Sequence, residues 1–95
     1  MPAYVVVQIE VTDPEKFEEY KKLVSPTIDT YGGRYLVRGG GTETLEGDWE
    51  PSRLVILEFP NTDRAKAWWS SEEYRVPKGI RQSASRCELL VADGL

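Results

Sequence analysis

The sequence predicts an α+β fold in which one antiparallel sheet carries helices on one side. Four segments alternate apolar and polar residues with the period of a β-strand, and the stretches between them have helical spacing. Their order is strand, helix, strand, strand, helix, strand. That order is the split βαβ arrangement of the ferredoxin-like fold. We therefore expect residues 1–95 to form a single ferredoxin-like domain.

The first strand and the first helix follow from their residue types. Residues 4–11 form a strand with one wholly apolar face and one mixed face. Asp13 can then cap a helix that begins at Pro14, where a missing N–H costs nothing. Gly32-Gly33 ends this helix with a geometry that glycine tolerates. Pro26 removes a backbone hydrogen bond inside it, so we expect a kink or a break just before this residue.

The middle of the chain predicts two strands joined by a long polar connection. Residues 34–38 form the second strand, and three consecutive glycines follow it. These glycines and the polar residues 42–52 predict a flexible hairpin arm. Residues 54–59 form the third strand, which Pro60 stops.

The last third of the chain predicts helical segments and a closing strand. Asn61 or Thr62 opens a short helix. Ser70, with Glu73 three residues later, matches a capping box and begins another helical stretch. Residues 87–93 form the final strand.

Both faces of the predicted sheet are rich in apolar residues. The face under the helices carries Val5, Val7, Ile9, Tyr35, Val37, Val55, Leu57, Phe59, Leu89 and Val91. The opposite face carries Tyr4, Val6, Gln8, Leu36, Arg38, Leu54, Ile56, Glu58, Leu90 and Ala92. The second set is too apolar to lie open in a monomer. A two-fold homodimer that stacks the two sheets would bury it and form a dimeric α+β barrel.

Composition excludes several classes of function. The net charge is −4 without a basic patch, which argues against a nucleic-acid partner. The chain has no histidine, so a Ser-His-Asp triad, a His-ligated haem and the usual zinc sites are excluded. With no metal-ligand cluster and no nucleotide-binding glycine motif, we expect neither a metal nor a cofactor. The single cysteine suits a cytoplasmic protein, and no apolar run approaches the roughly 20 residues of a membrane span.

Five segments together make the chain similar to a known family. They are Gly32-Gly33-Arg34-Tyr35-Leu36-Val37-Arg38-Gly39-Gly40, Leu45-Glu46-Gly47-Asp48-Trp49, Arg53-Leu54-Val55-Ile56-Leu57-Glu58-Phe59-Pro60, Ala67-Trp68-Trp69-Ser70-Ser71-Glu72-Glu73-Tyr74 and Val91-Ala92-Asp93-Gly94. They closely resemble domain-of-unknown-function family 1330, of the dimeric α+β barrel superfamily. The resemblance implies a ferredoxin-like protomer and a homodimer, and it implies no particular activity. Trp69 stands where the family often has tyrosine.

Glu58 is the leading candidate for a catalytic residue, because this carboxylate interrupts an otherwise apolar strand. Enclosed between two stacked sheets it would serve as a general base. The structural alternative is a carboxylate at the strand end that is wetted by solvent or paired with an arginine. Alternation places Arg38 on the same face, where it would bind the carboxylate or phenolate of a ligand. The structural alternative is that Arg38 neutralises Glu58 or reaches the partner subunit.

Four further residues are candidates for ligand binding, each with a structural alternative. Gln8 would orient a ligand from the inner face of the barrel, or it would satisfy Glu58. Trp69 and Tyr74 would wall an apolar pocket, or they would pack as core around the second helix. Arg81 would bind an anionic ligand, or it would belong to a solvated cationic face.

Two functions of different classes follow from these candidates. The first is a cofactor-independent enzyme or binder for a small aromatic or carbonyl-bearing acid. The second is a non-catalytic homodimeric structural or interaction module whose sheet-to-sheet core is simply filled. A cavity beside Glu58 would favour the first function, whereas tight packing of Leu36, Ile56 and Leu90 around it would favour the second.

Overall fold

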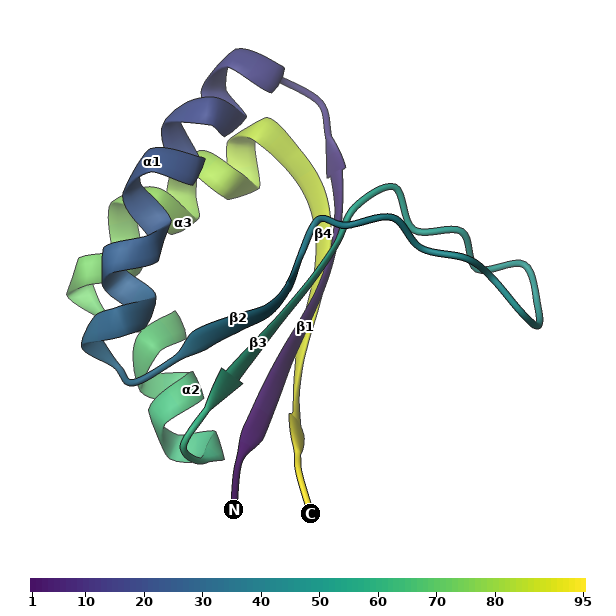
Figure 1. Cartoon of the computed structure of the whole chain (residues 1–95). Coiled ribbons are helices and arrows are strands. Elements are labelled where there is room, and N and C mark those ends of the chain that lie inside the picture. Colours follow the sequence, from purple (N-terminus) through teal and green to yellow (C-terminus); the bar gives the residue numbers. More distant parts are fainter.

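The computed structural model describes residues 1–95 as a two-layer α+β structure. Its elements are β1 (Ala3–Val11), α1 (Pro14–Thr30), β2 (Arg34–Arg38), β3 (Leu54–Phe59), α2 (Thr62–Trp69), α3 (Glu72–Ala84) and β4 (Ser85–Asp93). The four strands form one antiparallel sheet in the order β2-β3-β1-β4. All three helices lie on one side of this sheet, and both termini lie at the same end (Figure 1). The predicted ferredoxin-like fold is confirmed.

Helix α1 begins as predicted but does not break at its internal proline. The Asp13 side chain accepts a hydrogen bond from the Lys16 N–H at 3.2 Å, with Pro14 as the first helical residue. The helix continues through Pro26 to Thr30, so the predicted break is wrong. Pro26 and the residue one turn before it, Lys22, are both exposed. Water can therefore reach the carbonyl group that the proline leaves without a donor.

The junction between α2 and α3 differs from the prediction by one residue. Asn61 caps α2, and its side chain accepts from the Arg64 N–H at 2.8 Å. Ser70 ends α2 instead of beginning α3. The N-cap of α3 is Ser71, whose hydroxyl group accepts from the Tyr74 N–H at 3.1 Å. The predicted capping box at Ser70 is wrong, because the α2 turn closes first.

The hydrophobic core lies between the helices and the covered face of the sheet. Its largest fully buried side chains are Trp68 and Tyr74, whose rings stack with centroids 4.1 Å apart. Phe59 packs against the other side of Trp68, at 5.4 Å between centroids. These contacts hold the junction between α2 and α3 against the end of β3.

A register shift in β2 changes the face on which two residues lie. Tyr35 lies opposite Leu57, but Val37 is the next residue to pair, opposite Ile56. One extra residue in one of two paired strands defines a β-bulge. Beyond the bulge, each side chain of that strand points to the opposite face of the sheet from the one that simple alternation predicts. Arg38 consequently lies opposite Val55, on the face that the helices cover. The predictions that Val37 lies under the helices and that Arg38 lies on the open face are therefore wrong.

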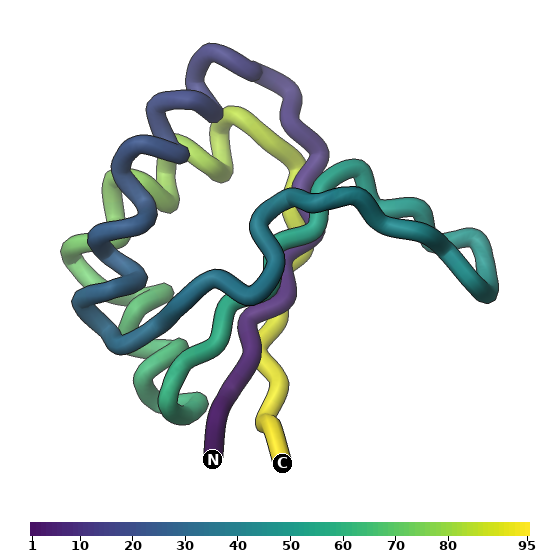
Figure 2. Tube along the Cα trace, viewed as in Figure 1, coloured from purple at the N-terminus to yellow at the C-terminus, as the bar shows by residue number.

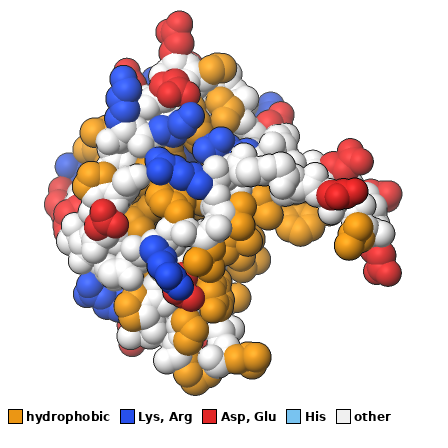
Figure 3. All heavy atoms as spheres, viewed as in Figure 1, with side chains coloured by type: hydrophobic (Ala, Val, Ile, Leu, Met, Phe, Trp, Pro, Cys, Tyr) orange, Lys and Arg blue, Asp and Glu red, His pale blue; other side chains and the backbone are white.

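Residues 39–53 form an arm that projects away from both layers (Figure 2). Acidic side chains gather at its tip, and hydrophobic side chains cover the sheet face beneath it (Figure 3). The indole N–H of Trp49 donates to the side-chain oxygen of Gln8 on that open face. The arm thus contacts the side of the sheet that no helix covers. None of the helices has the length and apolar character of a membrane span.

Candidate functional site

A narrow cavity lies between the helices and the covered face of the sheet. Its apolar walls come from Val7, Ile9, Phe17, Val24, Ile28, Val55, Leu57, Trp68 and Leu89. Polar or charged groups come from Tyr20, Lys21, Tyr35, Arg38, Arg53, Tyr74 and Arg81. The cavity and its mouth contain about 460 Å³ of space that no atom fills, but the centre of a water molecule can occupy only about 30 Å³ of it. The empty space is therefore a thin slot.

Three buried side chains form a polar cluster in this cavity, which we call the tyrosine–arginine cluster. The hydroxyl oxygens of Tyr20 and Tyr74 lie 2.9 Å apart. The Nε–H of Arg81 donates to the Tyr74 hydroxyl at 3.2 Å. The three residues are 8%, 0% and 3% exposed, respectively. A guanidinium group buried this deeply is unusual unless a partner compensates its charge.

The hydrogen bonds of the tyrosine–arginine cluster leave one phenolic proton free. The two hydroxyl groups share one proton between them, whichever of the two donates. The Tyr74 oxygen also accepts from Arg81, which has no acceptor atom of its own. Neither hydroxyl has a further protein acceptor. The second O–H is therefore available to a molecule in the cavity.

Both phenols are protonated at neutral pH, and burial extends this to more alkaline pH by raising their pKa. Desolvation raises the pKa of Tyr20, and the adjacent Tyr74 raises it further. Desolvation also raises the pKa of Tyr74, although the nearby Arg81 charge acts in the opposite direction. The cluster therefore presents a proton donor and a positive charge, and no base.

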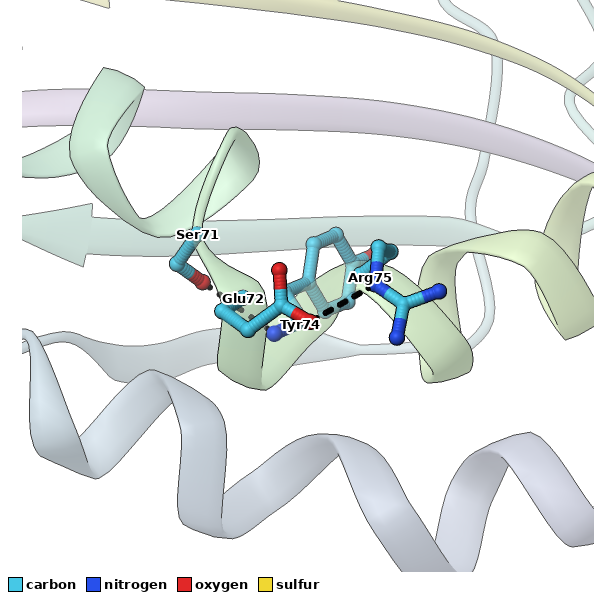
Figure 4. Close-up of polar contacts among 4 residues, drawn as sticks. All are labelled: Ser71, Glu72, Tyr74 and Arg75. Atoms are coloured by element: carbon cyan, nitrogen blue, oxygen red, sulfur yellow. Dashed lines mark hydrogen bonds and ion pairs between the residues drawn. The ribbon is translucent and has the colours of Figure 1, made fainter.

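Local sequence fixes Tyr74 in this position. Ser71 caps α3, and its hydroxyl group accepts from the backbone N–H of Tyr74. On the outer side of the same turn, Glu72 and Arg75 form an exposed ion pair at 2.9 Å (Figure 4). Stacking on Trp68 also holds the Tyr74 ring in place. The Trp68 indole N–H is itself satisfied by Thr27, at 3.1 Å. Trp68 is thus a wall of the cavity without a free polar group.

Three cationic side chains that line the cavity, those of Lys21, Arg38 and Arg53, reach the surface beside α1 and β2, and we take this region as the mouth of the cavity. Phe17, Lys21 and Ser25 follow one another at single-turn spacing, so they share one face of α1 and span about 12 Å. The Arg53 guanidinium lies 5.5 Å from the Phe17 ring centroid. The Arg38 guanidinium lies 3.4 Å from the Ser25 hydroxyl group. Basic side chains gather in this region, between α1 and the upper end of β2 (Figure 3).

Arg53 has unused hydrogen-bonding capacity at this mouth. Its Nε is buried and has no hydrogen-bond partner. Its guanidinium packs against Gly39, where an added Cβ would lie only 2.4 Å from it. An unpaired buried donor is costly unless something binds it.

The electrostatic balance of the cavity is strongly positive although the protein has a net charge of −4. Its lining includes Lys21, Arg38, Arg53 and Arg81, and no carboxylate. Lys21 pairs with Glu18 outside the cavity at 3.0 Å. None of the three arginines pairs with a carboxylate. An anion would therefore find charge-assisted donors here without having to displace an ion pair.

The structure brings together only some of the residues that the sequence nominated. Arg38, Tyr74 and Arg81 line the same cavity. Glu58 lies on the open face, where the Nε of Arg34 donates to its carboxylate at 2.8 Å. Its predicted neighbour Arg38 is on the other side of the sheet because of the bulge in β2.

The other two nominated residues also lie outside the cavity. Gln8 is on the open face and accepts from Trp49. Trp69 is 42% exposed at the end of α2, with the Lys78 ammonium 3.9 Å from its ring centroid. These two residues therefore belong to different surfaces of the protomer.

Two residues of the cavity were missed in the sequence. Tyr20 fits the apolar spacing of α1, so its hydroxyl group was not distinguished from the core. Arg53 directly precedes β3, and the strand period already places it on the same face as Val55 and Leu57. The strand period therefore contained enough information to predict that Arg53 faces the helices. No three His, Cys, Asp or Glu side chains come together as a metal-binding group would require.

Comparison with known proteins settles the family. The sequence profile described as "Domain of unknown function (DUF1330)" matches residues 2–95. The chain belongs to the DUF1330 family. A search of curated proteins finds no significant match to this sequence.

Several solved structures share the fold of this DUF1330 protein. A protein of unknown function from Rhodopseudomonas palustris aligns with a TM-score of 0.80 at 19% identity, over 99% of this chain and 82% of that one. A dimeric ferredoxin-like protein of unknown function from Jannaschia has a TM-score of 0.73 at 12% identity, over 99% and 100%. SnoaB, a cofactor-independent oxygenase from Streptomyces nogalater, has a TM-score of 0.66 at 11% identity, over 99% and 93%. At these identities the likeness concerns the fold.

Proposed function

We propose that this DUF1330 protein binds a small, flat organic acid in the cavity under its helices, as a cofactor-independent enzyme or binding protein. The observation that carries the proposal is the charge of the cavity. Four cationic side chains line it, none of the three arginines among them pairs with a carboxylate, and the Nε of Arg53 is buried without a partner. Such a site lowers the free energy of an anion relative to a neutral molecule of the same shape.

The shape of the cavity supports a flat ligand. The space that water can occupy is far smaller than a small-molecule site, so a ligand must be thin and the walls must part to admit it. Its walls include the rings of Phe17, Tyr35 and Trp68, which suit stacking against a planar ligand. SnoaB, a fold neighbour, is described as a cofactor-independent oxygenase. By analogy this fold can support chemistry without a cofactor.

Calorimetric titration with benzoate and the neutral, isosteric benzamide tests the proposal. We expect benzoate to bind, and benzamide to bind at least about tenfold more weakly, because it lacks the charge that the arginines recognise. Arg53→Gln should weaken benzoate binding by at least about tenfold. Arg34→Gln is the matched control, because Arg34 lies on the open face, and it should leave the affinity unchanged. Equal binding of benzamide, or an Arg53→Gln variant that binds benzoate normally, would overturn the proposal.

We also propose that the open face of the sheet stacks on a second copy of the chain. Ile56, Val6 and Leu90 form an apolar row across its centre. Leu90 is 57% exposed and Leu36 beside this row is 45% exposed. The Jannaschia neighbour is described as dimeric, which agrees with a covered face. A homodimer built in this way would leave the cavity on the outer side of the sheet.

Light scattering after size exclusion tests the dimer and separates the two function classes. Leu90→Lys should convert the dimer to a monomer, whereas Leu23→Lys, at an exposed position of α1, should not. A wild-type monomer, or a dimer that survives Leu90→Lys, argues against this interface. A dimer with a cavity that binds no acid would instead indicate a non-catalytic homodimeric interaction module.

A further inference from the structure

The two ends of the cavity offer different chemistry to a bound acid. At the mouth, Lys21, Arg38 and Arg53 provide cationic donors at the border with solvent. The tyrosine–arginine cluster provides one free phenolic O–H beside a buried guanidinium. We consider a ligand whose carboxylate binds the arginines at the mouth and leaves the cluster unused. The second set therefore calls for a second oxygen on the ligand.

The tyrosine–arginine cluster also lacks any group that would accept a proton. The other titratable or charged side chains that face it are Lys21, Tyr35, Arg38, Arg53 and Cys87. None of them is a carboxylate or an imidazole. A neutral hydroxyl group at this place could exchange hydrogen bonds with the tyrosine oxygens, whereas an ionised oxygen would accept from the free O–H and also gain the attraction of the Arg81 charge.

We infer that the tyrosine–arginine cluster binds the ionised oxygen of a phenol or of a preformed enol, so that the ligands of this cavity are acids that already carry such a hydroxyl group. The carboxylate of such a ligand lies at the mouth. The inference rests on the function proposed above and specifies its substrate class. In the binding step the ligand O–H bond breaks, the electron pair stays on oxygen, and the proton leaves to water. The arrangement is that of an oxyanion site preorganised by a buried donor and a fixed charge.

A measurable consequence is that binding lowers the pKa of the ligand hydroxyl group. A tenfold preference for the ionised oxygen over the neutral one moves the titration midpoint by about one pH unit. The shift depends on Tyr74 and Arg81, whereas the binding of the carboxylate depends on Arg53. The two contributions can therefore be separated by mutation.

The experiment uses 4-hydroxy-3-nitrobenzoate, whose phenolate form has its own absorption band, and 3-nitrobenzoate as the probe without the hydroxyl group. The absorbance of the bound hydroxy acid is followed against pH with protein in excess. With wild-type protein we expect the midpoint to fall by at least about one pH unit relative to the free probe. With Tyr74→Phe it should return toward the free value, while 3-nitrobenzoate still binds. Arg81→Gln, which removes the fixed charge and keeps both phenols, serves if Tyr74→Phe does not fold and should reduce the shift.

The outcomes distinguish the inference from the function on which it rests. If both probes bind and the midpoint does not fall, the inference is overturned and the anion-binding function stands. The same conclusion follows if the midpoint falls equally in wild-type protein and in the variants at Tyr74 and Arg81. If neither probe binds to wild-type protein, the proposed function is overturned and the inference with it. Arg53→Gln should weaken both probes to the same extent and leave the shift of any bound probe intact.

Discussion

The hydroxyl groups of Tyr20 and Tyr74 lie 2.9 Å apart, although one comes from α1 and the other from the first turn of α3. The contact joins the two long helices at a buried position and is extended by Arg81. Water does not reach these groups. Removing one partner of a hydrogen bond therefore leaves the other partner buried without a hydrogen bond. The stability of the fold and the chemistry of the cavity thus depend on the same three side chains.

Replacing Tyr74 with phenylalanine should destabilise the protein. The change keeps the ring that stacks on Trp68 but removes the acceptor of Arg81 and the partner of Tyr20. We expect the free energy of unfolding to fall by about 1–3 kcal/mol in urea denaturation. Tyr31→Phe is the control, because the Tyr31 hydroxyl binds Glu73 at an exposed position, and it should change stability by less than about 0.5 kcal/mol. Equal effects of the two changes would mean that the buried contact contributes no more than the exposed one.

The raised pKa of Tyr20 predicts a loss of stability in alkaline solution. Above its ordinary pKa of 10.0 the unfolded chain releases the phenolic proton, while the folded protein retains it because burial raises the pKa. The unfolded state then binds fewer protons, so the free energy of unfolding falls as pH rises past 10. Tyr20→Phe should make this decline shallower by up to about 1.4 kcal/mol per pH unit. Denaturation curves between about pH 8 and 11 measure the two slopes, and identical slopes would contradict the burial of an ionisable Tyr20.

Glu58→Gln should have little effect on stability and none on the cavity. The carboxylate pairs with Arg34 on the open face, and the Arg34 side chain is 69% exposed. Pairs of this kind contribute roughly 0–1 kcal/mol. We therefore expect a small shift in the urea midpoint and unchanged benzoate affinity in calorimetry. A large loss of affinity would instead support the general-base role that the sequence suggested for Glu58.

Gly39→Ala should disturb the mouth of the cavity. Gly39 has a positive φ of 70°, and a Cβ there would lie 2.4 Å from the Arg53 guanidinium. The substitution therefore costs about 1 kcal/mol in backbone strain and displaces Arg53. We expect lower thermal stability together with weaker benzoate binding. Gly40→Ala is the matched control, since an added Cβ meets nothing there, and loss of binding in both variants would point to the arm rather than to Arg53.

Much of the fold was predictable because it depends on local signals. The apolar alternation of residues 3–11 and 54–59 and the cap at Asp13 report directly on strands and helix starts. The covered face was predicted for the same reason, except in β2. In that strand the period fails at Leu36, where the structure inserts one unpaired residue. A bulge depends on how two strands match, and neither strand alone encodes it.

The candidate site was predictable in its residue types but not in its assembly. Arg38, Tyr74 and Arg81 were nominated for separate reasons, and the structure places them around one cavity. Tyr20 was missed because helical spacing cannot distinguish a tyrosine that fills the core from one that offers its hydroxyl group to a neighbour. Glu58 attracted attention as a charge in an apolar strand, yet its partner Arg34 lies on the neighbouring strand.

The sequence by itself determined the class of fold, the family, and the absence of histidine chemistry, since these depend on periodicity, composition and local motifs. The tertiary structure alone decided which side of the sheet each arginine faces and which buried groups meet across the core. A shift of one residue in β2 transfers Arg38 from the open face to the cavity. Packing of α1 against α3 brings Tyr20 to Tyr74 over 54 residues of chain. Such contacts arise from the joint packing of distant segments, which no local pattern of residues specifies.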